Sequence, residues 1–216
     1  MQDLQARPIT DTWVMADWDE YVRILENPLY EKAKGYYYKG HMRIEMLPVS
    51  FDHGSDHVVI IFAVNLFTAI MGIPATGLDT TTFRKTGMRD CQPDVSYYLG
   101  NGAKSIPSGT GVVNLDRYPA PTLVIEVSKS SLLDDVGAKR ALYEELGVDE
   151  YWVVDVQNAQ ILAYAMADQG SKRIQVSLVL PGLTISILEE ALRRSRETDQ
   201  SQVGNWLLTQ FQKKES

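Results

Sequence analysis

The sequence contains a single cysteine, Cys91, among its 216 residues. No disulfide can therefore form within the chain, and a reducing compartment fits this composition. The first residues, Met1 to Pro8, are polar and lack the apolar core of a signal peptide. We therefore expect a cytoplasmic protein.

Long apolar runs are also missing. The most apolar stretch, Val58 to Met71, has 14 residues and is interrupted by Asn65 and Thr68. A membrane-spanning helix needs about 20 apolar residues, so this stretch is too short. We predict that it forms a buried helix and that the protein has no membrane partner.

The chain has no excess of positive charge. It has 21 lysines and arginines against 28 aspartates and glutamates, and its net charge is −7. This balance argues against a broad basic surface for nucleic acid. It leaves open a local basic groove, or a metal ion that supplies positive charge where a phosphate binds. The sequence also has no nucleophile elbow, Walker loop or dinucleotide fingerprint.

The remaining composition is typical of one globular domain with its own core, since 44% of the residues are hydrophobic and 23% are charged. Capping residues and hydrophobic periodicity predict its secondary structure. Helices are expected over 18–26, 55–71, 133–146, 185–196 and 203–212, with Ser55 as the cap of the second. Strands are expected over 36–38, 41–47, 80–85, 93–99, 123–128, 150–156, 160–165 and 172–180, and a loop over 100–121. We divide the chain into an N-terminal extension (1–16), a main domain (17–187) and a C-terminal helical appendage (188–216).

Two carboxylates stand out because each lies on or beside a predicted strand. Asp94 follows Pro93 at the start of one strand, and Glu126 lies inside the apolar run Leu123–Ser128. A buried carboxylate is costly unless it is paired, hydrogen-bonded or bound to a cation. The alternatives are an aspartate that caps a loop and a glutamate that faces water from an edge strand. If the two strands are neighbours, the pair predicts a divalent metal site.

A lysine on the following helix could complete a phosphodiesterase site. The candidate is Lys139, which comes 13 residues after Glu126, and Tyr143 lies one turn further along the same helical face. The alternative is a solvent-exposed helix lysine, and Arg140 is a neighbouring competitor. Lys129 is closer in sequence, but strand alternation points it away from the face that carries Glu126.

Glu45 and the histidines give weaker signals. Glu45 is either a third acidic group near the metal or part of the polar face of a hairpin. His53 and His57 have the i, i+4 spacing of a helical zinc pair, but no cysteine or third histidine is near them in sequence. His57 at a helix start could instead touch a phosphate, or have no role.

Taken in order, these residues resemble the Uma-type endonuclease family, a branch of the restriction-endonuclease-like PD-(D/E)xK superfamily. The likeness runs from about Trp18 to Ile187. It implies an α/β fold with a restriction-endonuclease-like core, in which helices flank a central mixed β-sheet, and it makes 17–187 a nuclease domain. The residues that carry it are Glu45, His57, Pro93-Asp94, Glu126-Val127-Ser128, Lys139, Tyr143 and the stretch from Gly147 to Asp155.

The resemblance also implies a set of site residues. Asp94 and Glu126, with the backbone carbonyl of Val127, would bind Mg²⁺ or Mn²⁺, which prefer oxygen ligands. Lys139 would be the catalytic lysine, because Ser128 occupies the superfamily's usual lysine position two residues after the glutamate. The other residues carried over are Glu45 as a further catalytic acid and His57, Ser128 and Tyr143 as accessory residues.

The activity that the resemblance implies is metal-dependent hydrolysis of DNA phosphodiester bonds, and we expect a homodimer because one such site cuts one strand. Two other functions stay open. One is a catalytically silent domain that binds nucleic acid or protein, which the acidic net charge favours. The other is hydrolysis of small phosphoesters. A groove lined by basic residues such as Arg84, Lys85, Arg89 and Lys104 would speak against it.

Overall fold

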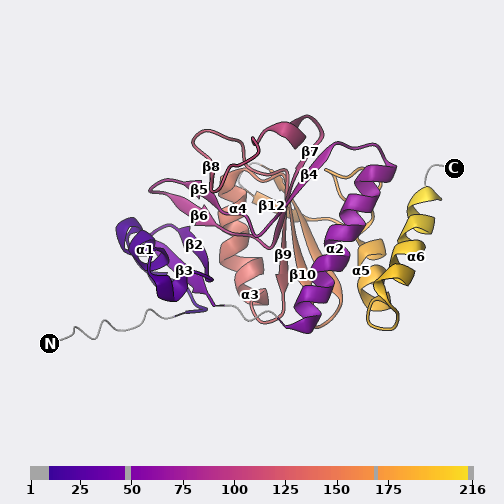
Figure 1. Ribbon diagram of the computed structural model, residues 1–216, viewed down its shortest axis with the longest axis horizontal. Helices are drawn as coiled ribbons and strands as arrows, with labels where there is room; N and C mark the ends of the chain where they lie inside the picture. Colours follow the sequence, from indigo (N-terminus) through magenta and orange to yellow (C-terminus); the bar gives the residue numbers. More distant parts are fainter. Residues whose placement is uncertain (1–9, 47–49, 168–169, 214–216) are drawn as a thin grey trace.

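The computed structural model describes residues 10–46, 50–167 and 170–213, which form two six-stranded sheets flanked by helices (Figure 1). The predicted α/β class is confirmed, with two mixed sheets where one was expected. Leu47, at the end of a predicted strand, and residues 1–9 of the predicted extension lie outside the described residues.

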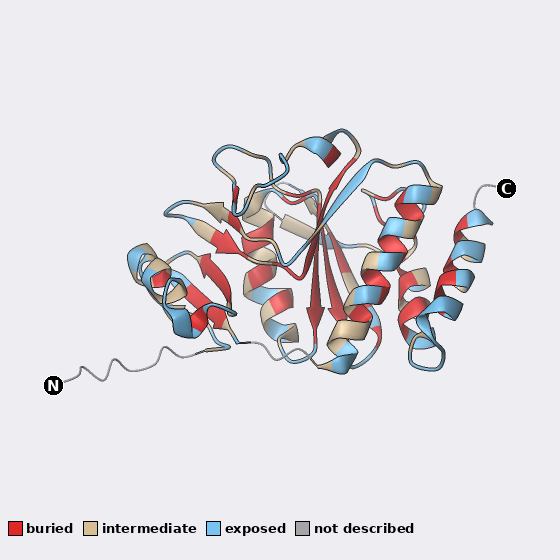
Figure 2. Ribbon diagram, viewed as in Figure 1, coloured by how far each residue is buried: buried red, intermediate tan, exposed pale blue. Residues whose placement is uncertain are grey.

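The sheet that we call the central sheet contains the strands predicted around Asp94 and Glu126. Its strands lie in the order β12-β11-β10-β9-β7-β4, and only β9 and β10 run parallel. Both are buried along their whole length, which explains why most of their residues are apolar (Figure 2). The bounds are β4 Ala75–Asp79, β7 Val95–Leu99, β9 Leu123–Ser128, β10 Glu150–Asp155, β11 Gln160–Ala167 and β12 Gly170–Arg173.

Helices cover both faces of the central sheet. On one face α2, α5 and α6 share a core with Trp152 and Val154 of β10. On the other face α4 packs with Tyr151 and Val153, because successive side chains of a strand point to opposite faces. The α-helices are α1 Trp18–Leu25, α2 Phe51–Ile70, α3 Leu132–Asp134, α4 Arg140–Leu146, α5 Ile185–Arg194 and α6 Gln200–Gln212, with single turns at η1 Pro28–Tyr30, η2 Gly100–Lys104 and η3 Asp135–Lys139.

The second sheet, here the N-terminal sheet, has the order β1-β3-β2-β6-β5-β8. The predicted hairpin is confirmed as β2 and β3, which turn at Lys39-Gly40, both with positive φ as a two-residue hairpin requires. Helix α1 packs so closely on β2 that a Cβ at Gly35 would lie 2.5 Å from the Tyr21 hydroxyl. The bounds are β1 Val14–Met15, β2 Lys34–Tyr38, β3 His41–Glu45, β5 Phe83–Lys85, β6 Arg89–Cys91 and β8 Val113–Asn114.

Helix α2 begins earlier than predicted. The Ser50 hydroxyl accepts a hydrogen bond from the His53 backbone N–H (3.3 Å), so Ser50 is the N-cap and Ser55 lies inside the helix. His53 and His57 therefore both lie within the first two turns.

Some strands were mispredicted because their pairing is set by distant parts of the chain. The strand expected over 172–180 ends at Arg173, since the backbone N–H groups of Leu178 and Val179 bond to the buried Glu150 carboxylate at 2.8 and 3.3 Å. Strands β1, β4 and β6 were not predicted, and the loop expected over 100–121 contains η2 and β8. Short strands of this kind depend on partners more than on their own residues.

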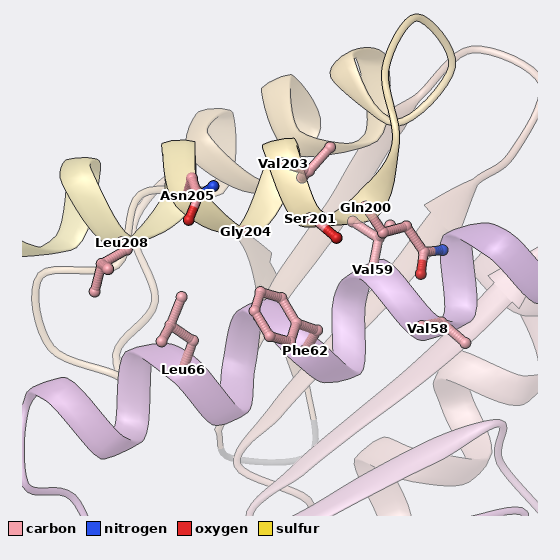
Figure 3. A pocket seen from close by; sticks show the side chains of 10 residues that line it. All are labelled: Val58, Val59, Phe62, Leu66, Gln200, Ser201, Val203, Gly204, Asn205 and Leu208. Atoms are coloured by element: carbon pink, nitrogen blue, oxygen red, sulfur yellow. The ribbon is translucent and has the colours of Figure 1, made fainter.

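Helices α2 and α6 pack side by side and leave an apolar groove of about 480 Å³ between them (Figure 3). Phe62, Leu66, Val203 and Leu208 are among the residues that line this α2–α6 groove. Gly204 allows the close approach, because a Cβ there would lie 3.1 Å from the Phe62 ring. By length and composition alone α2 could also cross a membrane. Its inner face, however, packs in the core, as predicted for a buried helix.

Candidate active site

A cavity of about 590 Å³ lies where the two sheets meet the start of α2. Strands β7 and β9 are neighbours in the central sheet, with Val95 opposite Ile125. Asp94, just before β7, and Glu126, in β9, therefore lie close together, as the predicted metal site requires. The structure brings five predicted residues to this cavity, Glu45, Asp94, Glu126, Val127 and Lys139, together with others that the sequence did not single out for it. The ionisable side chains among the lining residues include Lys34, Glu45, His53, Asp94, Glu126 and Lys139.

Asp94 lies just before β7 and is 4% exposed. Its Oδ2 accepts a hydrogen bond from the Val127 backbone N–H (2.7 Å), and its Oδ1 forms a short ion pair with Lys34. The His53 Nε2 atom lies 3.7 Å from the same Oδ1. Burial raises the pKa of Asp94, but His53 and Lys34 outweigh it and hold that pKa well below its usual value. Asp94 is therefore an anion at neutral pH.

Glu126, in β9, is 2% exposed and has a different environment. Its Oε1 accepts hydrogen bonds from the hydroxyls of Tyr143 (2.7 Å) and Tyr36 (3.2 Å). The pKa of Glu126 is raised to about 8. Burial is the largest cause; Lys139 partly offsets it, and the negative charge of Asp94 adds to it. The site thus holds two carboxylates of unequal acidity, as acid–base chemistry often requires.

Lys139 lies at the centre of a network of carboxylates and is 1% exposed. Its Nζ is 2.9 Å from Glu45 Oε1, 2.9 Å from Asp135 Oδ1 and 3.7 Å from Glu126 Oε1. The Tyr36 ring lies beneath it at 4.1 Å. Burial lowers the pKa of Lys139, but these carboxylates raise it well above its usual value, so the amine keeps its proton.

A π-helical turn presents Lys139 to the site. The segment expected as one helix over 133–146 is α3, the π turn η3 and α4 in succession. Turns of this kind are frequent at functional sites, because the extra residue redirects a side chain. Here the turn carries both Lys139 and its partner Asp135, whose Oδ2 accepts a bond from the Ser131 hydroxyl (2.6 Å).

Glu45 joins β3 to this network. Its Oε1 accepts a bond from Arg43 Nε at 2.7 Å in addition to the Lys139 contact. Burial raises the pKa of Glu45, but the positive charges of Lys139 and Arg43 lower it by more, so the pKa lies below its usual value. Glu45 therefore lies among cations, on the cavity side of its hairpin.

The accessory residues predicted from the resemblance lie around the cavity rather than in its lining. Tyr143 is fully buried and holds Glu126. The Ser128 hydroxyl lies 3.4 Å from that of Ser131. His57 Nε2 lies 3.3 Å from the backbone oxygen of Asp94, and 3.5 Å from Asp79 Oδ1.

The competing cations are paired with other carboxylates. Lys129 lines the same cavity, although strand alternation was expected to point it away, and its Nζ bonds to Ser50 Oγ and Asp52 Oδ2, both at 3.0 Å. Arg140 faces Glu144 at 3.5 Å. The basic residues considered for a groove do not line this cavity, and two of them are engaged with other carboxylates. Arg84 pairs with Asp90 and Arg89 with Glu145.

Sequence reasoning missed Lys34, Tyr36 and Asp135, and it placed His53 outside the helix. Lys34 and Tyr36 alternate along β2 and so share one face, which lies over the two carboxylates. The sequence does show that Lys34 and Tyr36, two positions apart in a strand, share one face. It does not show what that face contacts, because Asp94 lies 60 positions from Lys34.

The donor set suits a hard divalent cation. Asp94 and Glu126 present carboxylate oxygens to one cavity, and Mg²⁺ is usually held by one or two carboxylates with water and phosphate completing its shell. Across 10–46, 50–167 and 170–213, no group of three or more His, Cys, Asp or Glu side chains is arranged to hold a metal.

The raised pKa of Glu126 makes a stability prediction for the metal-free protein. A carboxyl group whose pKa is near 4.5 when unfolded and about 8 when folded binds its proton more tightly in the fold. Its contribution to stability is therefore greatest below pH 4.5 and is lost as the pH rises towards 8. We expect Glu126→Gln, which can still accept from Tyr143 and Tyr36, to remove this loss.

Thermal unfolding in EDTA between pH 6 and pH 9 measures the effect. The midpoint of the variant is expected to rise relative to the wild-type midpoint as the pH increases. A constant difference between the two proteins over this range would show that Glu126 titrates normally.

Comparisons with known proteins show the family and the fold of the chain. The family model Uma2, described as "Putative restriction endonuclease", matches residues 18–201. A solved structure described as a putative nuclease belonging to DUF820 from Anabaena variabilis superposes with a TM-score of 0.57 at 16% sequence identity, over 82% of this chain and 98% of that chain. At this identity the likeness shows a shared fold. No curated protein matches the chain.

Proposed function

The chain belongs to the Uma2 family of restriction-endonuclease-like proteins, and we propose that it is a metal-dependent endonuclease that hydrolyses phosphodiester bonds in DNA. One observation carries this proposal. Asp94 and Glu126, from neighbouring strands, share a cavity with a buried, protonated lysine whose Nζ lies 3.7 Å from Glu126 Oε1.

In the proposed mechanism Asp94 and Glu126, with the backbone carbonyl of Val127, would hold Mg²⁺ or Mn²⁺. When bound, the cation supplies Lewis acidity and positive charge for the scissile phosphate. Tyr36 and Tyr143 fix the Glu126 carboxylate, and burial raises the pKa of both hydroxyls, so they remain donors.

Lys139 acts as a fixed positive charge rather than as a base, because its amine stays protonated. Its Nζ would stabilise the negative charge that develops on the phosphate, or orient the attacking water. Glu45 and Asp135 hold this ammonium at 2.9 Å each, which removes the cost of reorganising it during the reaction.

The experiment is cleavage of supercoiled plasmid, linear duplex, single-stranded DNA and a small phosphodiester with Mg²⁺, Mn²⁺ or EDTA. Asp94→Ala protein purified in the same way is the control for contaminating nucleases. We expect metal-dependent nicking of DNA by the wild type alone. Equal activity of both proteins would mean a contaminant, and cleavage of the small ester only would indicate a different hydrolase.

A folded protein that binds Mn²⁺ but cleaves none of these substrates would instead support the silent binding domain. The acidic net charge of −7 favours such a role. The assay therefore separates the three functions that the sequence left open.

We also propose that the protein acts as a homodimer, because a duplex break needs two single-strand cuts. The α2–α6 groove is the face that a second copy would cover, since Val58, Phe62 and Leu208 are 49%, 44% and 37% exposed around it. Light scattering is expected to give twice the chain mass of 24.3 kDa, and Phe62→Glu is expected to give the monomer. Leu29→Glu, which changes an exposed leucine on η1, is the matched control. A wild-type monomer would contradict the proposal.

A further inference from the structure

Lys34 is a buried cation at the cavity that the mechanism above does not use. It comes from β2 of the N-terminal sheet and is 5% exposed. Its Nζ contacts Asp94 Oδ1 in a short ion pair between residues 60 positions apart. Tyr36, two residues later on the same face, contacts Glu126. Strand β2 thus places one side chain on each carboxylate.

Both oxygens of Asp94 are engaged by the protein itself. Oδ2 accepts from the Val127 N–H at 2.7 Å, and that bond is part of the backbone arrangement between β7 and β9. Oδ1 is held by the Lys34 ammonium, with His53 Nε2 at 3.7 Å. Of these groups only the two side chains can move away without disturbing the sheet, and Lys34 makes the direct contact. A divalent cation that approaches Asp94 meets a positive charge at the oxygen it needs.

We propose that Lys34 is a positioning residue that serves as the built-in counter-ion of Asp94, and that a divalent cation binds Asp94 only by displacing the Lys34 ammonium from Oδ1. This inference rests on the proposed metal-dependent function. The ion pair keeps Asp94 charged and oriented in the absence of metal. It also sets the metal affinity, because the binding energy must cover separation of the pair and repulsion between two cations.

Lys34→Met tests this through metal binding alone. Titration with Mn²⁺, followed by the electron paramagnetic resonance of the free ion, gives the dissociation constant for wild type and variant. Removing a unit charge next to a divalent ion is expected to tighten binding by about tenfold or more. The variant is also expected to gain a larger rise in melting temperature from Mn²⁺ than the wild type, since it has no counter-ion without metal.

Lys129→Met is the matched control. Lys129 lines the same cavity, but its Nζ bonds to Ser50 and Asp52 rather than to Asp94. A general effect of cavity charge would change both variants alike. Displacement at Asp94 predicts a much larger change for Lys34→Met, and equal changes would overturn the inference.

A measurement on the unmodified protein covers the case in which Lys34→Met fails to fold. Reductive methylation followed by peptide mass spectrometry reports the reactivity of each lysine with and without Mn²⁺. Metal is expected to increase labelling of Lys34 relative to Lys129, because the displaced amine is no longer paired. Unchanged labelling at saturating Mn²⁺ would overturn the inference.

The two proposals fail in different ways. If the wild type binds Mn²⁺ and Lys34→Met binds it equally or more weakly, the counter-ion role is wrong and the metal site stands. If the wild type binds no Mn²⁺ that depends on Asp94, the metal-dependent function fails and the counter-ion role fails with it.

Discussion

Asp94→Asn is expected to abolish metal-dependent cleavage, with a loss of at least about 1,000-fold in the rate of plasmid nicking. The substitution keeps the size of the side chain, and the amide oxygen can still accept from the Val127 N–H that Asp94 Oδ2 binds at 2.7 Å. It removes the negative charge that would attract the cation and that the Lys34 ammonium pairs with. Initial rates with Mn²⁺ at saturating DNA measure the loss.

The same change is expected to lower stability, because it leaves Lys34 buried without its carboxylate. Breaking one partner of a buried ion pair costs about 3–5 kcal/mol. The double variant Asp94→Asn/Lys34→Met is expected to recover most of this stability in urea unfolding while cleavage stays absent. Recovery of both stability and activity in the double variant would mean that Asp94 acts only through folding.

Lys139→Met has the second-largest expected effect. Loss of one preorganised positive charge at the reacting phosphate is expected to slow cleavage by about 100- to 1,000-fold. It also leaves the Glu45, Asp135 and Glu126 carboxylates without the ammonium that lies 2.9, 2.9 and 3.7 Å from them, at a cost of about 3–5 kcal/mol. Rates must therefore be measured at a temperature at which the variant remains folded.

The neighbouring Arg140→Met separates a catalytic role from a general effect of charge. Arg140 follows Lys139 directly, but its side chain is about one-third exposed and faces Glu144 at 3.5 Å. A single partly exposed pair at this distance contributes about 1 kcal/mol or less, and cleavage is expected to stay near the wild-type rate. If Lys139→Met binds Mn²⁺ normally and cleaves as fast as Arg140→Met, Lys139 has no part in the reaction.

The elements that the sequence predicted correctly are those with strong local signals. Helix α1 begins at Trp18 as predicted, after Asp17, whose side chain accepts from the Glu20 N–H, and α4 ends at Gly147 with φ of 80°. Strands β9 and β10 could be predicted because burial on both faces favours a nearly continuous apolar run. Capping and periodicity act over a few residues, so a sequence carries them directly.

The errors had two sources. The start of α2 was a local choice between two serines: Ser50 has the extended backbone of a cap, whereas Ser55 has the same side chain without that geometry. The segment after Arg173 leaves the sheet because its backbone N–H groups bond to the Glu150 carboxylate, which is 28 positions from Leu178. That second outcome is not encoded within the few residues that a local pattern samples.

The candidate site divides in the same way. By itself, the sequence singled out Asp94, Glu126 and Lys139, because a carboxylate in a buried strand needs compensation and a resemblance named the lysine. Only the tertiary structure placed Lys34 and Tyr36 over the carboxylates and Asp135 beside Lys139. The physical reason is that local residue chemistry predicts which groups need partners, whereas the packing of two sheets decides which partners they receive.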